Sequence, residues 1–320
     1  MKITLDVSRL VEEGKLTSEE AERLTKLAAR DTASLGLNIL VGFAVVAIAA
    51  GAVALAPAPL TAIGFGLALF AAGFAIALNR VQHWMLLGQI FLVIGALMFG
   101  GGAIAYRGDL LATMLIITGV FGLAAIIARS SLLMALAVLA ASACLGARTG
   151  YSHASYSLAI YEPTLTVAVF SMVALIAYQA SQRLPAEYAR LAITAARTSL
   201  LLINFGFWIG SLWGDPLMLM RSLAAEDVSS TLMTKPVIPS LVFSVLWAAA
   251  LLGAGLWAVR ANRRWLVNLV AVFSGIHFYT QWFEKLGATP FSVLLGGLVM
   301  LASAIALWMF NRRVADRDKA

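Results

Sequence analysis

The strongest constraint on this chain is a series of long apolar runs, each close to the length of a helix that crosses a bilayer. A hydrocarbon core of about 30 Å needs about 20 apolar residues in a helix. About ten such runs follow one another, separated by short segments that hold most of the charges. Hydrophobic residues make up 61% of the chain and charged residues 12%, whereas soluble domains carry about 25% charged residues. Lipid must therefore be the solvent for much of the chain.

These runs predict an all-α fold, a polytopic transmembrane helix bundle of about ten spans. Unbroken apolar runs lack the alternation that a transmembrane barrel needs. The sixth run has an alternative start near Ser157. Pro163 is then either a kink or the first residue of a helix, a position that proline favours. The predicted spans are Leu35–Leu55, Leu60–Leu78, Trp84–Tyr106, Leu110–Ala128, Ser131–Ala147, Thr164–Tyr178, Thr198–Trp213, Val237–Val259, Trp265–Phe283 and Pro290–Phe310.

The basic residues predict the orientation of these spans, because cytoplasmic connections carry an excess of lysine and arginine. With a cytoplasmic N-terminus, the outer connections hold five of the 23 basic residues and the inner segments hold the rest. Adding or removing one span would scramble this asymmetry. We therefore expect a multi-pass protein of the bacterial inner membrane with both termini in the cytoplasm. The five outer basic residues are Arg107, Arg148, Arg221, Lys235 and Lys285.

The N-terminal segment predicts a short cytosolic helical hairpin over residues 1–34, before a bundle over 35–310 and a basic cytosolic tail over 311–320. The first helix covers Val7–Glu13 and has Gly14 as its C′ residue. Thr17 and Glu20 form a capping box for the second helix. The hairpin is either a docking site for a cytosolic partner protein or a charged collar that rests on the bundle or on lipid headgroups.

Three short stretches resemble the uncharacterised bacterial membrane family DUF2157. They are the N-terminal segment Leu10–Ala21, the span end Ile104–Asp109 and the C-terminal segment Arg264–Asn268, which Tyr279, Phe283 and Glu284 follow. The resemblance implies an inner-membrane protein of several helices. It implies no activity and transfers no catalytic residue.

Polar residues inside spans are costly and so mark candidate sites. The seventh span places such residues within about 60° of one helix face. They can line a hydrated path for a solute, or they can hydrogen-bond across a packed helix interface. The residues of this face are Arg197, Asn204, Trp208, Ser211 and Asp215.

A second polar face lies on the ninth span and spreads over about 80°. Histidine titrates near neutral pH, so His277 can pass a proton, or it can be satisfied by a neighbouring helix. Glu162, next to Pro163 at the outer edge of the sixth span, completes the set of candidates. The residues of the ninth-span face are Ser274, His277, Gln281 and Glu284.

Glycines crowd the second and third spans at Gly64, Gly66, Gly73, Gly95 and Gly100–Gly102. Small residues let helices approach closely, and the three consecutive glycines could instead unwind the third span, as in broken transporter helices. The sequence holds no nucleotide loop, metalloprotease motif or nucleophile elbow. Its one cysteine forms neither an internal disulfide nor a zinc site. We expect no cofactor, no metal and no nucleic-acid partner.

Three functions remain open. The first is a small-molecule or ion transporter or channel with a polar cavity among spans six, seven and nine. The second is a non-catalytic scaffold or sensor that recruits a partner through the N-terminal hairpin. The third is an intramembrane enzyme in which His277 and an outer acid supply acid–base chemistry; no signature of a catalytic residue supports it, and we expect the protein not to be an enzyme.

Overall fold

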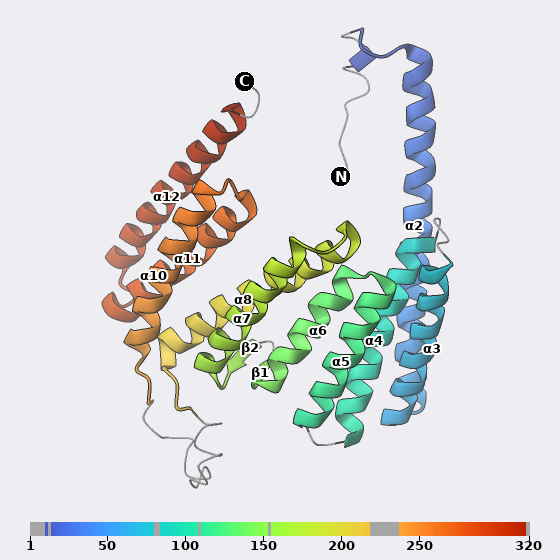
Figure 1. The fold of residues 1–320 in the computed structure, drawn as a ribbon, viewed down its shortest axis with the longest axis horizontal. Helices are drawn as coiled ribbons and strands as arrows, with labels where there is room; N and C mark the ends of the chain where they lie inside the picture. Colours follow the sequence, from blue (N-terminus) through green and yellow to red (C-terminus); the bar gives the residue numbers. More distant parts are fainter. Residues whose placement is uncertain are drawn as a thin grey trace. The chain divides into compact units, whose positions relative to one another are not determined.

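The computed structural model describes residues 10–11, 14–79, 84–107, 110–152, 155–217 and 237–317 (Figure 1). These residues form helices, apart from one two-stranded antiparallel sheet. They divide into two compact units. Unit 1 holds residues 1–141 and 184–194, and unit 2 holds 142–183 and 195–320.

Every predicted apolar run lies largely within one helix. Six helices, α3, α4, α5, α7, α8 and α10, are long and apolar enough to cross a membrane. Three further apolar stretches are shorter, at Ile39–Leu55, Ser131–Cys144 and Pro290–Ile305. The helices are α2 Ser18–Leu55, α3 Pro59–Leu78, α4 Met85–Arg107, α5 Leu110–Ala128, α6 Ser131–Cys144, α7 Pro163–Ser181, α8 Ala186–Trp213, α10 Ser240–Arg260, α11 Arg264–Leu286 and α12 Pro290–Arg317.

The connection before α2 has the local geometry that the sequence predicts. Gly14 has a φ of +66°, and the N–H groups of Gly14 and Lys15 donate to the carbonyls of Val11 and Leu10. This pair of bonds ends a helix in a Schellman motif. Thr17 then caps α2, and the capping box with Glu20 is complete. Most of the predicted first helix, Val7–Glu13, lies outside the described residues, so the hairpin stays a prediction.

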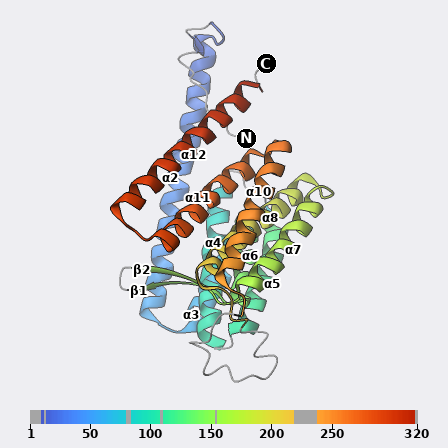
Figure 2. The ribbon, with the colours of Figure 1, turned by 90° about the vertical axis from the view of Figure 1, so that its left-hand side faces the viewer.

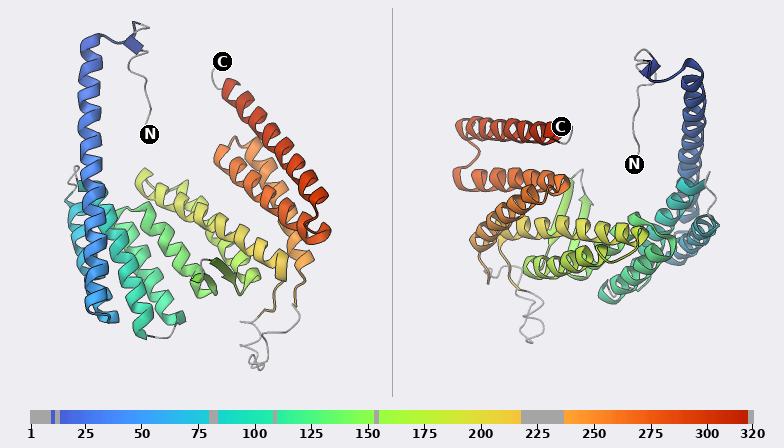
Figure 3. Two further views of the ribbon diagram at one scale, coloured as in Figure 1. Left: turned by 180° about the vertical axis from the view of Figure 1, so that it is seen from behind. Right: turned by 45° about the horizontal axis from the view of Figure 1, so that its top comes forward.

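The boundary predicted at residue 34 is not a break in the helix. α2 is continuous from Ser18 to Leu55, as Figure 3 shows, so the second hairpin helix and the first span are one element. The segment between them holds no proline or internal cap that would end a helix. The C-terminal tail behaves similarly, because α12 continues past Phe310 to Arg317.

Unit 1 is organised by the close packing of α3 on α4, which lie side by side in Figure 1. A Cβ added to Gly66 would lie 2.6 Å from the Phe99 backbone nitrogen, and one added to Gly95 would lie 2.8 Å from the Gly66 carbonyl oxygen. Neither position therefore has room for a side chain, which confirms the expected role of the glycines. α4 is helical through Gly100–Gly102, so the predicted unwinding at that run is absent.

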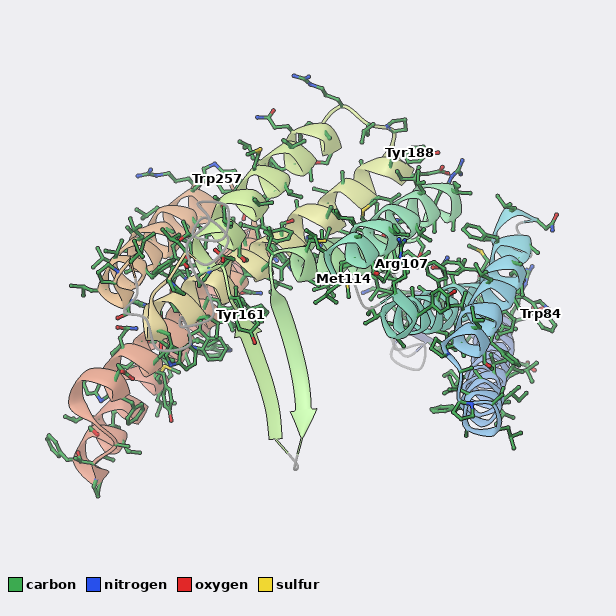
Figure 4. The ribbon with its side chains drawn as sticks, turned by 90° about the horizontal axis from the view of Figure 1, so that it is seen from below. Trp84, Arg107, Met114, Tyr161, Tyr188 and Trp257 are labelled. Carbon is green, nitrogen blue, oxygen red and sulfur yellow. The ribbon has the colours of Figure 1, made fainter. Side chains whose placement is uncertain are left out.

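Polar contacts in unit 1 join the ends of its helices. The Ser130 hydroxyl, just before α6, donates to Gln89 Oε1 of α4 at 2.5 Å. Arg129 forms an ion pair with Glu187 at the start of α8, and its guanidinium lies over the Tyr188 ring. Gln89 thus serves helix packing. Trp84 and Tyr106, near the two ends of α4, are exposed, as expected of an aromatic belt; Figure 4 labels Trp84.

A two-stranded hairpin, β1 Ala147–Ser152 and β2 Ser155–Ile160, replaces the loop expected before the sixth span. It ends the fifth run early, because Ala147 begins a strand and α6 stops at Cys144. It also excludes a sixth span that begins near Ser157. Gly146, with a φ of +84°, makes the turn from α6 into β1 beside Tyr161, which Figure 4 labels. Pro163 is the first residue of α7, as predicted.

Unit 2 has an aromatic core where α8, α10 and α11 meet. Trp247 of α10 is fully buried and packs with Leu251 and Phe273. Phe205 of α8 reaches the same cluster, and its ring lies edge-on to Phe273 with centroids 5.7 Å apart. α10 and α11 are connected by a short turn and run side by side (Figure 2). Large rings therefore set the helix separations here, and Gly210 of α8 makes room for the Phe243 ring of α10, since a Cβ added to Gly210 would lie 2.5 Å from that ring.

Candidate functional site

The centre of the candidate site is a hydrogen bond between α8 and α10. The Trp247 indole N–H donates to Asn204 Oδ1 at 2.9 Å, and the Asn204 amide donates to the Leu200 carbonyl at 2.8 Å. Both residues are buried. An amide with partners on both of its sides is fixed in orientation. Asn204 therefore holds the indole of Trp247 in place.

His277 of α11 contacts the other side of this pair. Its ring lies edge-on to Trp247, with the ring centroids 4.8 Å apart and an interplanar angle of 77°. A chain of contacts thus runs from Asn204 through Trp247 to His277. The periodicity of the sequence places Asn204 and His277 on two separate faces and does not single out the tryptophan that joins them.

Three buried nitrogen atoms in this part of unit 2 have no hydrogen-bond partner among the described residues. They are Trp208 Nε1, His277 Nδ1 and Gln281 Nε2. Gln281 lies one turn beyond His277 on α11. A buried polar group without a partner costs about 1–3 kcal/mol, so such atoms mark places where water or a polar solute would be held.

Asp215 has a different environment, although it lies on the predicted face of the seventh span. It is fully buried just beyond α8. Its Oδ2 accepts the Thr164 N–H in the first turn of α7 at 2.8 Å, and its Oδ1 accepts the Leu217 N–H at 2.7 Å. Its backbone also pairs with Ile238, ahead of α10. A carboxylate at a helix N-terminus is stabilising, so Asp215 ties together the ends of three helices.

Glu162 lies at the same place, as the N-cap residue of α7, and is 5% exposed. Both residues bond the first turn of α7: Asp215 accepts the Thr164 N–H through its side chain, and the Glu162 backbone carbonyl accepts the Thr166 N–H at 2.9 Å. His277 lies elsewhere, in the aromatic core.

The remaining candidates occupy varied surroundings. The buried Ser211 hydroxyl donates to the Trp208 carbonyl of its own helix at 2.8 Å. Ser274 is half-buried on α11, one turn before His277. Arg197 and Glu284 are exposed, and the Arg197 guanidinium lies 4.8 Å from the centroid of the Trp265 ring. Among the described residues, the Asn204–Trp247–His277 core joins one residue of each predicted face.

An apolar groove of about 540 Å³ lies beside this core, between α8, α11 and α12. Of the predicted site residues it includes only Trp208. Its lining comes mainly from small and apolar α11 side chains together with Met300 of α12, which the sequence does not single out. The groove is lined by Trp208, Ala271, Val272, Gly275, Ile276, Tyr279, Thr280 and Met300.

Trp247 and Met300 are the residues of this region that sequence reasoning missed. Tryptophan normally gathers at membrane interfaces, and Trp247 instead lies near the middle of its predicted span. That position is the signal which could have identified it. Met300 carries no such signal, because a methionine in an apolar run is ordinary.

Comparison with family models, curated proteins and solved structures finds no match to this chain. The class of the protein therefore rests on its fold. The described residues form a predominantly helical chain with six helices that are long and apolar enough to cross a membrane. The chain has the architecture of an integral membrane protein.

Proposed function

We propose that the chain crosses the bacterial inner membrane ten times and keeps both termini in the cytoplasm. Contacts between connections support this topology. In unit 1, Arg129 after α5 pairs with Glu187 at the start of α8, and both lie in segments predicted to be cytoplasmic. In unit 2, Asp215 after α8 contacts the start of α7 and Ile238 before α10, and these are predicted to be outer segments. If an odd number of spans lay between the two members of such a pair, they would lie on opposite sides of the membrane and could not be in contact.

We propose further that the protein is a transporter or channel for a small polar solute or an ion, and that unit 2 contains its path. The observation that carries this proposal is the set of unpartnered buried nitrogens of Trp208, His277 and Gln281. Within a bilayer, an unsatisfied polar group cannot form a hydrogen bond with bulk water. Passing water or a polar solute would accept hydrogen bonds from the Trp208 and Gln281 N–H groups, and water, a solute or a proton would be the partner of His277 Nδ1.

His277 has the central role in this path. A neutral imidazole has one nitrogen that donates and one that accepts, so its Nδ1 can receive or release a proton as a solute passes. Trp247, which is hydrogen-bonded to Asn204, packs against one side of the His277 ring. Arg197 and Asp215, at opposite ends of α8, and Glu162 and Glu284 at the predicted outer side, form the approaches to the path.

Flux measurements in proteoliposomes test the proposal. His277→Ala and Asn204→Leu should each reduce flux of the transported solute at least about tenfold, the loss expected when one essential polar contact of about 1.4 kcal/mol is removed. Trp257→Phe is the matched control, because Trp257 lies exposed on the same helix as Trp247 (Figure 4). Unchanged flux in both variants, for every solute screened, would refute a transport path here.

A membrane scaffold or sensor is the second candidate. It is favoured by Asn204, Ser211 and Asp215, whose side chains make hydrogen bonds within the bundle. The N-terminal segment would then recruit a cytosolic protein. Removing residues 1–16 leaves α2 whole, and it should abolish capture of that partner while flux stays at the liposome background. A partner set that survives the deletion would argue against this function. Membership of the resembled DUF2157 family is compatible with either function.

A further inference from the structure

The end of α8 and α11 that carries arginines has a cation over an aromatic ring. The Arg197 guanidinium lies over Trp265, with 4.8 Å between its Cζ atom and the ring centroid. Both side chains are exposed. A guanidinium carries five N–H donors, and a ring that interacts with its charge leaves donors for an acceptor such as a phosphate. In the part of the chain that the structure describes, no carboxylate forms an ion pair with Arg197.

Further arginines lie close to Trp265 along the chain. Arg260, Arg263 and Arg264 lie exposed at the turn between α10 and α11, and Arg263 Nη2 donates to the Tyr178 hydroxyl at 3.5 Å. Trp257 packs edge-on against the Tyr178 ring. Tyrosine and tryptophan rings of this kind settle at the headgroup level of a bilayer. The arginines are thus at the depth where lipid phosphates lie.

The apolar groove lies farther along the same helix faces as this arginine end. Arg197 and Trp208 are eleven residues apart on α8, which brings them within about 20° of one direction and separates them by about 16 Å. On α11, Trp265 shares a face with Val272 and Ile276 at offsets of seven and eleven residues. We call this line of contact between α8 and α11 the seam.

The groove is suited to a hydrocarbon chain and not to a polar ligand. Its walls are the apolar surfaces of Val272, Gly275, Ile276 and Met300. The Thr280 hydroxyl at its edge already donates to the Ile276 carbonyl at 2.8 Å. The separation of about 16 Å along the seam matches half of a hydrocarbon core of about 30 Å, which is the depth that one leaflet's acyl chains reach.

From these observations we propose that the seam binds one anionic phospholipid, with its phosphate on the N–H groups of Arg197 and an acyl chain in the groove. The positive charge of the neighbouring arginines selects an anionic headgroup over a zwitterionic one. The groove accounts for the preference for a whole lipid over a free phosphate. The lipid site shares Arg197 with the approach to the proposed path and Trp208 with the unpartnered nitrogens. Its chemistry differs from that of the path, because lipid binding needs no unpartnered nitrogen.

Native mass spectrometry of the full chain in detergent tests the headgroup end. Phosphatidylglycerol with C16–C18 chains should bind in preference to phosphatidylcholine with the same chains. Arg197→Gln should weaken phosphatidylglycerol binding about fivefold, the contribution of one arginine at an anionic surface. Arg197→Lys, which keeps the charge and loses the planar guanidinium, should weaken it less. The matched control is Arg183→Gln, an exposed arginine between α7 and α8 that is away from the seam.

A glycine pair tests the groove end. Gly275→Leu would place a side chain in the groove beside Met300, whereas Gly253→Leu on α10 points into open space. Gly275→Leu should reduce binding of the long-chain lipid and leave binding of dioctanoyl phosphatidylglycerol unchanged; Gly253→Leu should change neither. Equal binding of the two headgroups by the wild type would overturn the proposal, as would equal losses in Arg197→Gln and Arg183→Gln. Full displacement by inorganic phosphate would show a site for the free anion and would also overturn it.

Discussion

The α3–α4 pair of unit 1 and the α8–α10–α11 core of unit 2 solve helix packing in opposite ways. In unit 1 the two backbones touch at Gly66 and Gly95, with no space for a single added carbon. In unit 2 large rings, Trp247 and Phe273 among them, hold the helices apart. Close backbone packing leaves no room for a guest molecule. Ring packing leaves buried nitrogens and an apolar groove, so both proposed binding functions fall in unit 2.

The largest expected effect concerns the hydrogen bonds of Asp215, which join helix ends in unit 2. Asp215→Ala removes two hydrogen bonds from a buried carboxylate and leaves the Thr164 and Leu217 N–H groups without their acceptor. We expect a loss of about 3 kcal/mol in unfolding free energy. Reversible unfolding in mixed micelles measures it. Asp215→Asn keeps one acceptor and should lose less; equal stability of Asp215→Ala and the wild type would show that these bonds do not hold the helix ends.

A pair of glycines tests the packing of unit 1. Gly66→Ala forces a methyl group against the Phe99 backbone, which cannot rotate away, so we expect a loss of about 2 kcal/mol. Gly64→Ala meets no atom within 4 Å and should be neutral or raise stability by up to about 1 kcal/mol, because alanine favours the helix. The difference in unfolding free energy between the two variants is the measurement. Similar values for both would mean that α3 and α4 are not packed closely.

The hydrogen bond of the unit 2 core gives a smaller effect. Asn204→Leu leaves the buried Trp247 N–H without an acceptor and should cost about 1.5 kcal/mol. Trp247→Phe removes the donor as well. A double-mutant cycle should therefore give a coupling of about 1 kcal/mol. Additive losses in the double variant would contradict the bond between the two side chains.

The smallest effect lies outside both packing regions, at the start of α2. The Thr17 backbone N–H and its hydroxyl both donate to Glu20 Oε2, and these bonds lower the pKa of Glu20 below its usual value. A lowered carboxyl pKa stabilises the cap above the ordinary value of about 4.3, and the stabilisation is lost as pH falls through the lowered pKa. The protection factor of the Glu20 amide, which is the intrinsic exchange rate divided by the observed rate, should be constant from about pH 7 to 5 and should fall below about pH 4. Glu20→Gln should remove this pH dependence; a wild-type profile that stays flat would contradict the capping role.

Local patterns predicted much of the fold, because apolar length, caps and glycines act over a few residues. The ten runs fall in helices, and Gly14, Thr17 and Pro163 take their predicted places. The hairpin of β1 and β2 was missed, since its residues read as a polar loop between two spans. The continuity of α2 was missed as well, because a change from charged to apolar composition does not break a helix.

The candidate site was only partly predictable. Periodicity places Asn204 and Asp215 on one face of α8, and it cannot say that one bonds an indole of α10 and the other caps α7. His277 was singled out for its type, while its neighbour Trp247 depends on a tertiary contact. Which helices become neighbours is decided by non-local packing, and a single sequence carries little information about it.

The unbroken helix α2 has a mechanical consequence. Its 38 residues span about 57 Å, nearly twice the thickness of a hydrocarbon core. A helix of this length without a hinge behaves as a stiff lever, so a small tilt of the apolar half at Leu55 swings Ser18 through a wider arc. Under the proposed topology, a tilt of the apolar half of α2 within the bilayer would displace the N-terminal end of the helix outside it.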